Sequence, residues 1–218
     1  MKTNQEYKNL ALDRLRGNWA PAVIPSLVFY FILLAIFGGS WLPYYVPTLP
    51  SLFALVPGGL VFLLYLFVFP LDVGFMNAFR VFYERRDDRL TGNMFELGFS
   101  AYWHNVGGMF FYGLKLWLWF LLLIVPGFIM CFAYAMTPFI LNDHPELSAW
   151  EASRRSEEMM RGHKWRLFCL ELSFIGWYLL AILTFGIGLL WLIPYVTTSL
   201  AAFYNDLKAE QGEEAVTE

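Results

Sequence analysis

The chain has 218 residues, of which 58% are hydrophobic and 15% are charged, and its formal net charge is −3. Soluble domains carry about 25% charged residues, so this composition argues against a soluble globular protein. The charges are also unevenly placed, because long apolar tracts alternate with short charged segments, as in membrane spans and their loops. Cys131 and Cys169 both lie within apolar tracts, which excludes a disulfide framework.

The N-terminal segment, residues 1–17, is hydrophilic and lacks the apolar core of a cleaved secretory signal. Thr3 and Glu6 have the spacing of a capping box, in which two side chains satisfy free amides at a helix start. Gly17 has the position of a helix stop, and Trp19 that of an anchor at the membrane interface. The segment therefore predicts an amphipathic cytoplasmic helix.

Six apolar tracts follow, and most of them approach the 20 or so residues needed to cross about 30 Å of hydrocarbon. Their connections on one side contain no charged residue, and two of them are only a few residues long. We therefore predict an all-α polytopic membrane protein with six transmembrane helices arranged as three hairpins. The predicted spans are Pro21–Trp41, Gly58–Phe79, Val106–Ile124, Phe128–Leu141, Leu167–Leu183 and Leu189–Tyr204.

Basic residues lie on one side of this arrangement. Of the 15 lysine and arginine residues, all except Lys115 precede Trp19, fall in Arg80–Arg89 or Arg154–Arg166, or occupy position 208. An excess of lysine and arginine marks the cytoplasmic face. Both termini are therefore predicted to be cytoplasmic, and the connection at residues 41–57 is predicted to be outside.

The hairpins show signs of an internal repeat. Each turn has a glycine followed seven residues later by a tyrosine, and each cytoplasmic segment has a candidate capping box. The glycine–tyrosine pairs are Gly58 and Tyr65, Gly127 and Tyr134, and Gly188 and Tyr195; the boxes are Thr3 and Glu6, Asn93 and Glu96, and Ser148 and Glu151. Parallel repeats imply a pseudo-symmetry axis along the membrane normal.

The single membrane domain, residues 1–208, would then consist of three repeat units at about 1–82, 83–145 and 146–208. Residues 209–218 are predicted to be a disordered acidic tail. Trp19, Trp103 and Trp165 are the interface anchors, and the repeat predicts that they lie at one level.

Ionisable residues within apolar spans are the main candidates for a functional site. A charge there costs several kcal/mol unless it is paired or hydrated, so Asp72, Lys115 and Glu171 are either functional groups or structural ion pairs. From the rise of about 1.5 Å per residue, Lys115 and Asp72 reach similar depths, which predicts that they pair. Weaker candidates are the hydroxyl groups of Tyr134, Thr137, Tyr195 and Thr198, which between membrane helices more often serve packing.

Catalytic and metal-binding motifs are missing, so we expect no enzyme activity, no metal site and no cofactor. Residues 142–146 fit either a metal loop or, as we favour, a helix stop before the Ser148 cap. The segment Ser148–Arg161 has charge pairs at i,i+4 spacing and small residues on another face. It is interpreted as a self-stabilised helix packed on the bundle, or as a docking helix for a soluble partner.

Several stretches in the second half of the chain carry a family resemblance. They are Glu151-Ala152, Met159–Phe168, Leu183–Gly188, Pro194-Tyr195 and Ala202–Tyr204. In these residues the chain resembles the bacterial integral membrane family called domain of unknown function 975. The resemblance implies a protein of the bacterial inner membrane, and the family brings no established substrate or catalytic residue.

Two functions follow as hypotheses. The first is a non-enzymatic membrane scaffold or accessory protein, whose partners are the lipid bilayer and a cytoplasmic or membrane protein, with no nucleic acid. The second is a small-molecule or ion transporter or channel, with a polar pathway near Asp72 and Lys115. A continuous water-accessible cavity that reaches Lys115 between the hairpins would favour transport, and a dry, closed bundle would favour the scaffold.

Overall fold

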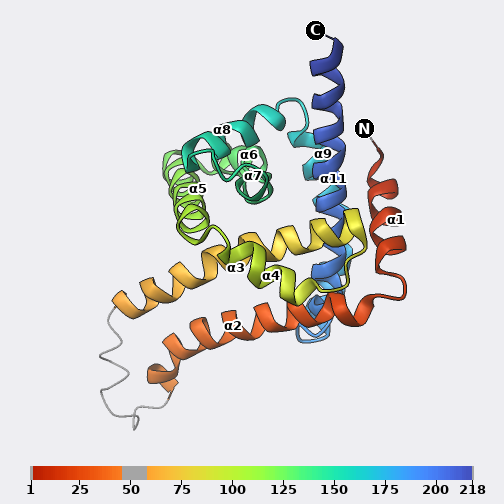
Figure 1. Ribbon diagram of the computed structural model, residues 1–218. Helices are drawn as coiled ribbons and strands as arrows, with labels where there is room; N and C mark the ends of the chain where they lie inside the picture. The colour runs from red at the N-terminus through yellow and green to blue at the C-terminus, as the bar shows by residue number, and fades with distance from the viewer. Residues whose placement is uncertain (1, 46–57, 218) are drawn as a thin grey trace.

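The computed structural model describes residues 2–45 and 58–217, with side chains at 2–34 and 66–212. The described elements are all helices, which confirms the predicted all-α class. Figure 1 shows their arrangement. In chain order they are α1 (Asn4–Leu15), α2 (Trp19–Tyr45), α3 (Gly58–Arg85), α4 (Leu90–Phe99), α5 (Tyr102–Leu122), α6 (Ile124–Ala133), α7 (Thr137–Asp143), α8 (Ala149–Met159), α9 (Lys164–Leu172), α10 (Ile175–Leu183) and α11 (Leu189–Thr217).

Several of these helices have the length and hydropathy of membrane spans, which supports the assignment as a membrane protein. Four stretches of the described chain qualify, and they correspond to predicted spans two to five: Leu66–Arg85, Tyr102–Leu122, Ile124–Asp143 and Lys164–Leu183. The bent pair α1 and α2 would add a fifth if counted as one span. The prediction of six spans therefore stays a prediction.

Two of the predicted spans are interrupted, and each break has a local cause. The fourth divides into α6 and α7, where Pro138 occupies the first turn of the new helix and has no amide to donate. The fifth divides into α9 and α10 beside Ser173, whose hydroxyl donates to the carbonyl of Leu170 at 2.6 Å. Such bonds from serine compete with the regular helix ladder.

The helix ends follow the capping predictions in two of three places. Thr3 with Glu6 and Ser148 with Glu151 form reciprocal capping boxes at the starts of α1 and α8. The box predicted at Asn93 is wrong: α4 begins at Leu90, three residues earlier, and has no side-chain cap. Asn93 instead donates to Asp87 at 3.1 Å, because its amide faces the preceding loop.

Helix α1 packs along α11. Its buried face consists of Tyr7, Ala11 and Leu15, and the ring of Tyr7 meets that of Phe203 edge-on at 5.4 Å. The hydroxyl of Tyr7 donates to Asp206 at 2.6 Å. The bend between α1 and α2 measures 101°, so α2 and its neighbour α3 cross α11 instead of running alongside it (Figure 1).

Helix α11 is longer than predicted. It continues to Thr217, through the segment expected to be a disordered acidic tail. Its alanine, glutamate and glutamine residues are good helix formers, which accounts for the difference. Of the connection predicted to lie outside, residues 46–57 fall outside the described residues.

Candidate functional site

The candidate site is a pocket of about 520 Å³ on one side of α5. Its walls come from α5, from the break between α6 and α7, and from α8. The lining residues are Lys115, Leu118, Trp119, Leu122, Tyr134, Trp150, Arg154 and Glu157. Of the three buried charges predicted as candidates, this pocket contains Lys115.

The ammonium group of Lys115 lies among aromatic rings. Its Nζ is 3.6 Å from the ring centroid of Trp150 and 5.5 Å from that of Tyr134. It also donates to the backbone carbonyl of Trp150 at 3.5 Å, a long hydrogen bond. The side chain is only 9% exposed. Cation–π contacts of this kind stabilise a desolvated cation by about 2 kcal/mol.

The predicted pairing of Lys115 with Asp72 is wrong. Among the ion pairs of the described chain none joins these two residues. The depth calculation left out helix rotation, and the rotation of α5 directs Lys115 towards α8, while Asp72 lies on α3. Asp72 and Glu171 are each partly buried, and neither lines the Lys115 pocket.

The weaker candidates divide between the pocket and the helix interfaces. Tyr134 lines the pocket, whereas Thr137 is fully buried at the start of α7. Tyr195 packs edge-on against Phe174 at 5.1 Å, and Thr198 donates to the carbonyl of Pro194 within its own helix at 2.7 Å. These two residues make contacts within and between helices, and Tyr195 also lines an apolar groove.

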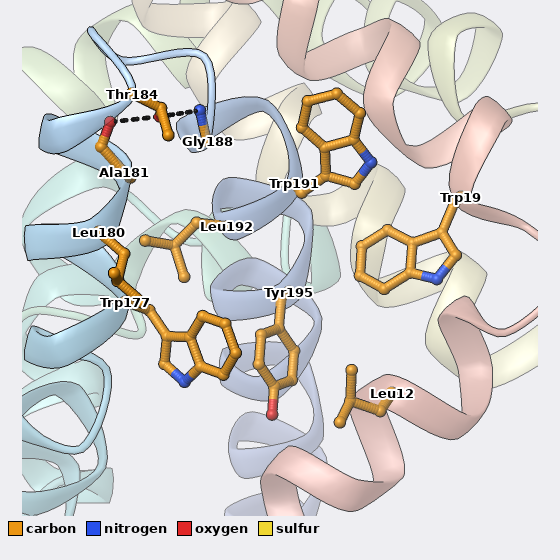
Figure 2. Close-up of a pocket in the computed structure, with 10 residues that line it drawn as sticks. All are labelled: Leu12, Trp19, Trp177, Leu180, Ala181, Thr184, Gly188, Trp191, Leu192 and Tyr195. Atoms are coloured by element: carbon orange, nitrogen blue, oxygen red, sulfur yellow. Dashed lines mark hydrogen bonds between the residues drawn. The ribbon is translucent and has the colours of Figure 1, made fainter.

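The predicted interface anchors differ in environment. Trp103 and Trp165 are 75% and 71% exposed, as anchors in a headgroup layer would be. Trp19, the first residue of α2, is partly buried and lines an apolar groove of about 410 Å³ between α1, the start of α2, α10 and α11, together with Trp177 and Trp191 (Figure 2). That the three anchors lie at one level stays a prediction.

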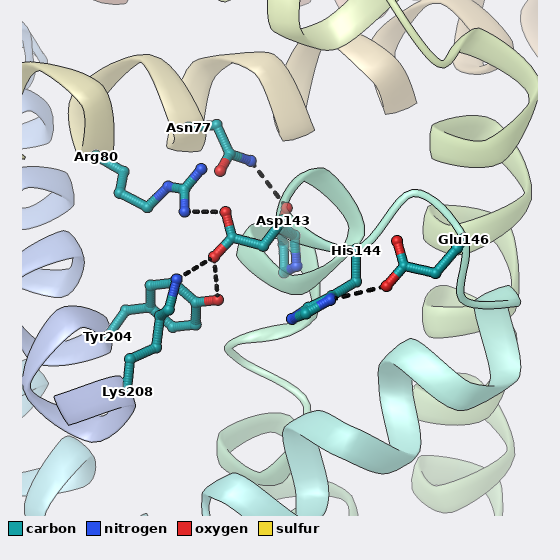
Figure 3. A network of polar contacts seen from close by, with 8 residues as sticks. Asn77, Arg80, Asp143, His144, Glu146, Tyr204 and Lys208 are labelled. Atoms are coloured by element: carbon teal, nitrogen blue, oxygen red, sulfur yellow. Dashed lines mark hydrogen bonds and ion pairs between the residues drawn. The ribbon is translucent and has the colours of Figure 1, made fainter. Parts of the chain in front are cut away.

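A second polar centre was missed by the sequence analysis. Asp143, the last residue of α7, forms an ion pair with Arg80 of α3 and accepts from Tyr204 and Lys208 of α11 at 2.8 and 2.7 Å (Figure 3). Arg80 is only 6% exposed. These four residues, the Asp143 network, tie three helices together.

Asn77 strengthens the same junction by donating to the carbonyl of Pro138 at 2.8 Å. Asp143 belongs to the segment for which a metal loop and a helix stop were weighed, and it ends α7, as the second interpretation requires. The one available signal was the position of Arg80 and Asp143 at the ends of two apolar tracts. No spacing rule connects residues 63 positions apart.

The comparison with protein families matches residues 62–211 to the family described as Protein of unknown function (DUF975). The chain belongs to this family. The match begins within α3 and includes every residue of the Lys115 pocket and of the Asp143 network, so both features lie in the part shared with DUF975. Neither the curated proteins nor the solved structures gave a match.

Proposed function

We propose that the protein is a non-enzymatic scaffold or accessory protein of the bacterial inner membrane. The observation that carries the proposal is the Asp143 network, because its four polar side chains connect α3, α7 and α11 to one another. Such interhelical ties give a rigid platform. A transport pathway would instead need its polar groups to face a common passage.

The cytoplasmic helices supply the surface that a scaffold needs. One face of α8 is buried through Ala152, Ser153 and Ser156, as predicted for a helix packed on the bundle. Its opposite face exposes charges of both signs, including Arg155 and Glu158. Mixed charge on a well-packed helix suits a protein partner with complementary charges.

The finer topology belongs to the same proposal: six spans as three parallel hairpins, with both termini in the cytoplasm. The one-sided distribution of lysine and arginine supports it. The reciprocal capping boxes of α1 and α8, each followed by a left-handed glycine at Gly17 or Gly162, support a repeat between the first and third units.

One observation favours a second function, a small-molecule or ion transporter or channel. A pocket does reach Lys115, which is the feature that a polar pathway requires. Asp72, the other residue proposed for that pathway, is not among the residues that line the pocket. The transporter hypothesis therefore rests on Lys115 alone.

Site-specific photo-crosslinking in cells tests the scaffold proposal. A photoreactive residue at Arg155 should give a discrete protein adduct that disappears when Glu158 is changed to Lys. The same residue at Leu179, an apolar position that is 59% exposed on α10, serves as the lipid-facing control. If Arg155 gives no adduct while proteoliposomes show a flux that Lys115→Met abolishes, the protein is a transporter.

A further inference from the structure

Lys115 has no direct anionic partner in the described residues: the carboxylate of Glu157 lines the same pocket and attracts the ammonium group, but no ion pair joins the two. The side chain is nine-tenths buried, and the ion pairs found in the described residues do not include it. An ammonium group has three donors, and the carbonyl of Trp150 takes up one of them over a long distance. Burying a charge in this state is costly unless an anion approaches it. The pocket therefore has space for an anionic ligand, and such a ligand would stabilise the buried ammonium group.

Charges on α8 complete the polar side of the pocket. Trp150, Arg154 and Glu157 follow one another at i, i+4 and i+7, so they lie along one face of the helix. Arg154 has a contact with Glu158 at 3.5 Å, and both side chains are more than half exposed, which makes this pair weak. With Lys115, the pocket contains two cations and one carboxylate, so its net charge is positive and favours an anion.

The remaining walls of the pocket are apolar. Leu118, Trp119 and Leu122 follow α5 towards its end. Leu118 is 51% exposed, Leu122 is 65% exposed, and the neighbouring Leu121 is 67% exposed. In a membrane such side chains face the acyl chains of lipids. The ligand must therefore join a negative head to a hydrocarbon tail.

We propose that the Lys115 pocket binds one anionic phospholipid, with its phosphate at the ammonium group of Lys115 and its acyl chains along Leu118 and Leu122. Trp150 and Tyr134, whose rings contact the ammonium group, flank the headgroup. The acids interleaved on α8 weaken any diffuse basic field, so the lipid is selected by the pocket and not by the surface. This site goes beyond the scaffold role and does not depend on it.

Lipid binding to the purified full-length protein tests the site. Native mass spectrometry and thermal unfolding are measured with phosphatidylglycerol, with phosphatidylcholine and with inorganic phosphate. We expect saturable binding of one phosphatidylglycerol and a raised Tm, with little effect of the other two. Lys115→Met should weaken the binding about tenfold, the loss of one charge-assisted hydrogen bond, and Lys115→Arg should retain most of it.

The matched control is Lys164→Met, which removes a lysine at the start of α9, outside the pocket, and should leave the binding unchanged. Arg154→Gln, at an exposed pocket position, gives a second reading if Lys115→Met does not fold, with an expected loss of a few-fold. Equal effects of phosphatidylglycerol and phosphatidylcholine would overturn the proposal. So would equal stabilisation by phosphate alone, or binding that neither pocket substitution weakens.

Discussion

At the residue scale, the Asp143 network is the strongest polar feature of the molecule. Arg80→Met should lower the free energy of unfolding by about 3–5 kcal/mol, because the side chain of Asp143, only 12% exposed, loses its buried cationic partner. Unfolding in detergent measures the loss. Arg154→Gln is the control: it breaks a pair whose side chains are 66% and 53% exposed, and should cost no more than about 1 kcal/mol. Equal losses in the two variants would mean that burial does not strengthen the network.

A second prediction concerns Asp206, which joins α11 to the N-terminus. Partial burial opposes ionisation, but hydrogen bonds from Lys2 and Tyr7 prevail and lower the pKa of Asp206 from 3.8 to about 2. A depressed pKa gives stability that is fully present above the unfolded value and is lost as the pH falls through the folded one. The difference in Tm between the native protein and Asp206→Asn should therefore shrink from about pH 4 to pH 2.

The matched control for this pH profile is Asp88→Asn, at an exposed position in the loop before α4. Its Tm should follow that of the native protein over the whole range. A difference between the native protein and Asp206→Asn that stays constant down to pH 2 would show that Asp206 acts only by packing.

Residue-level contacts were the least predictable part of the candidate site. The sequence identified Lys115 as a buried charge, because a lysine within an apolar tract is visible without any structure. It assigned the wrong partner, since depth along a helix is set by sequence position while rotation is set by packing. The contacts of Trp150 and Tyr134 with Lys115 depend on how α8 lies against α5. This packing joins segments that are far apart in the chain.

At the element scale, α3 and α4 meet through two glycines, Gly74 and Gly98. A Cβ atom at Gly74 would lie 1.9 Å from the carbonyl oxygen of Met94 and 2.7 Å from the amide nitrogen of Gly98. Both are backbone atoms, so a side-chain rotation cannot relieve the clash. Small residues at such crossings let membrane helices approach closely.

Gly74→Ala should consequently separate α3 from α4 and cost roughly 1–3 kcal/mol or more, as overpacking does. The readout is the Tm in detergent together with the yield of folded protein. Gly92→Ala is the control on the same helix pair, because a Cβ there meets nothing within 4 Å. It should be neutral or slightly stabilising, since alanine favours a helix. A Gly74→Ala protein as stable as the control would contradict the close crossing.

Helix ends could be predicted where the determinants are local. Thr3 and Ser148 each cap a helix through a residue three positions away, and Gly17 and Gly162 adopt φ of +80° and +84° as helix stops. The prediction failed at Asn93, which has the same local spacing but donates to Asp87. Helix α4 begins at Leu90, so Asn93 already lies within its first turn and cannot act as the cap.

At the scale of the whole molecule, the sequence predicts the class of the fold better than its assembly. Apolar tracts and a one-sided charge distribution are properties of composition along the chain, and they lead to a helical membrane protein. The docking of α1 along α11 depends instead on complementary surfaces, such as Tyr7 against Phe203. The place of the bend after α1 has a local signal in Gly17, but its angle of 101° has none.

The last prediction concerns the sidedness of the membrane. Reporter fusions that are active only in the periplasm should be active after Pro47 and inactive after Arg89, Arg155 and Lys208, because the positions with dense basic charge stay in the cytoplasm. Val125, 69% exposed in the first turn of α6, should also give an active fusion. Its turn contains no charge that would hold it back from crossing.

The fusion at Arg89 is the decisive one. It follows the second predicted span and lies within a segment that contains Arg80, Arg85 and Arg86, so the positive-inside tendency is strong there. Activity at Arg89 would reverse the orientation of the first hairpin and with it the six-span arrangement. Activity at Val125 with none at Arg89 and Arg155 would place both ends of the second hairpin in the cytoplasm, where α8 and its charged face can meet a soluble partner.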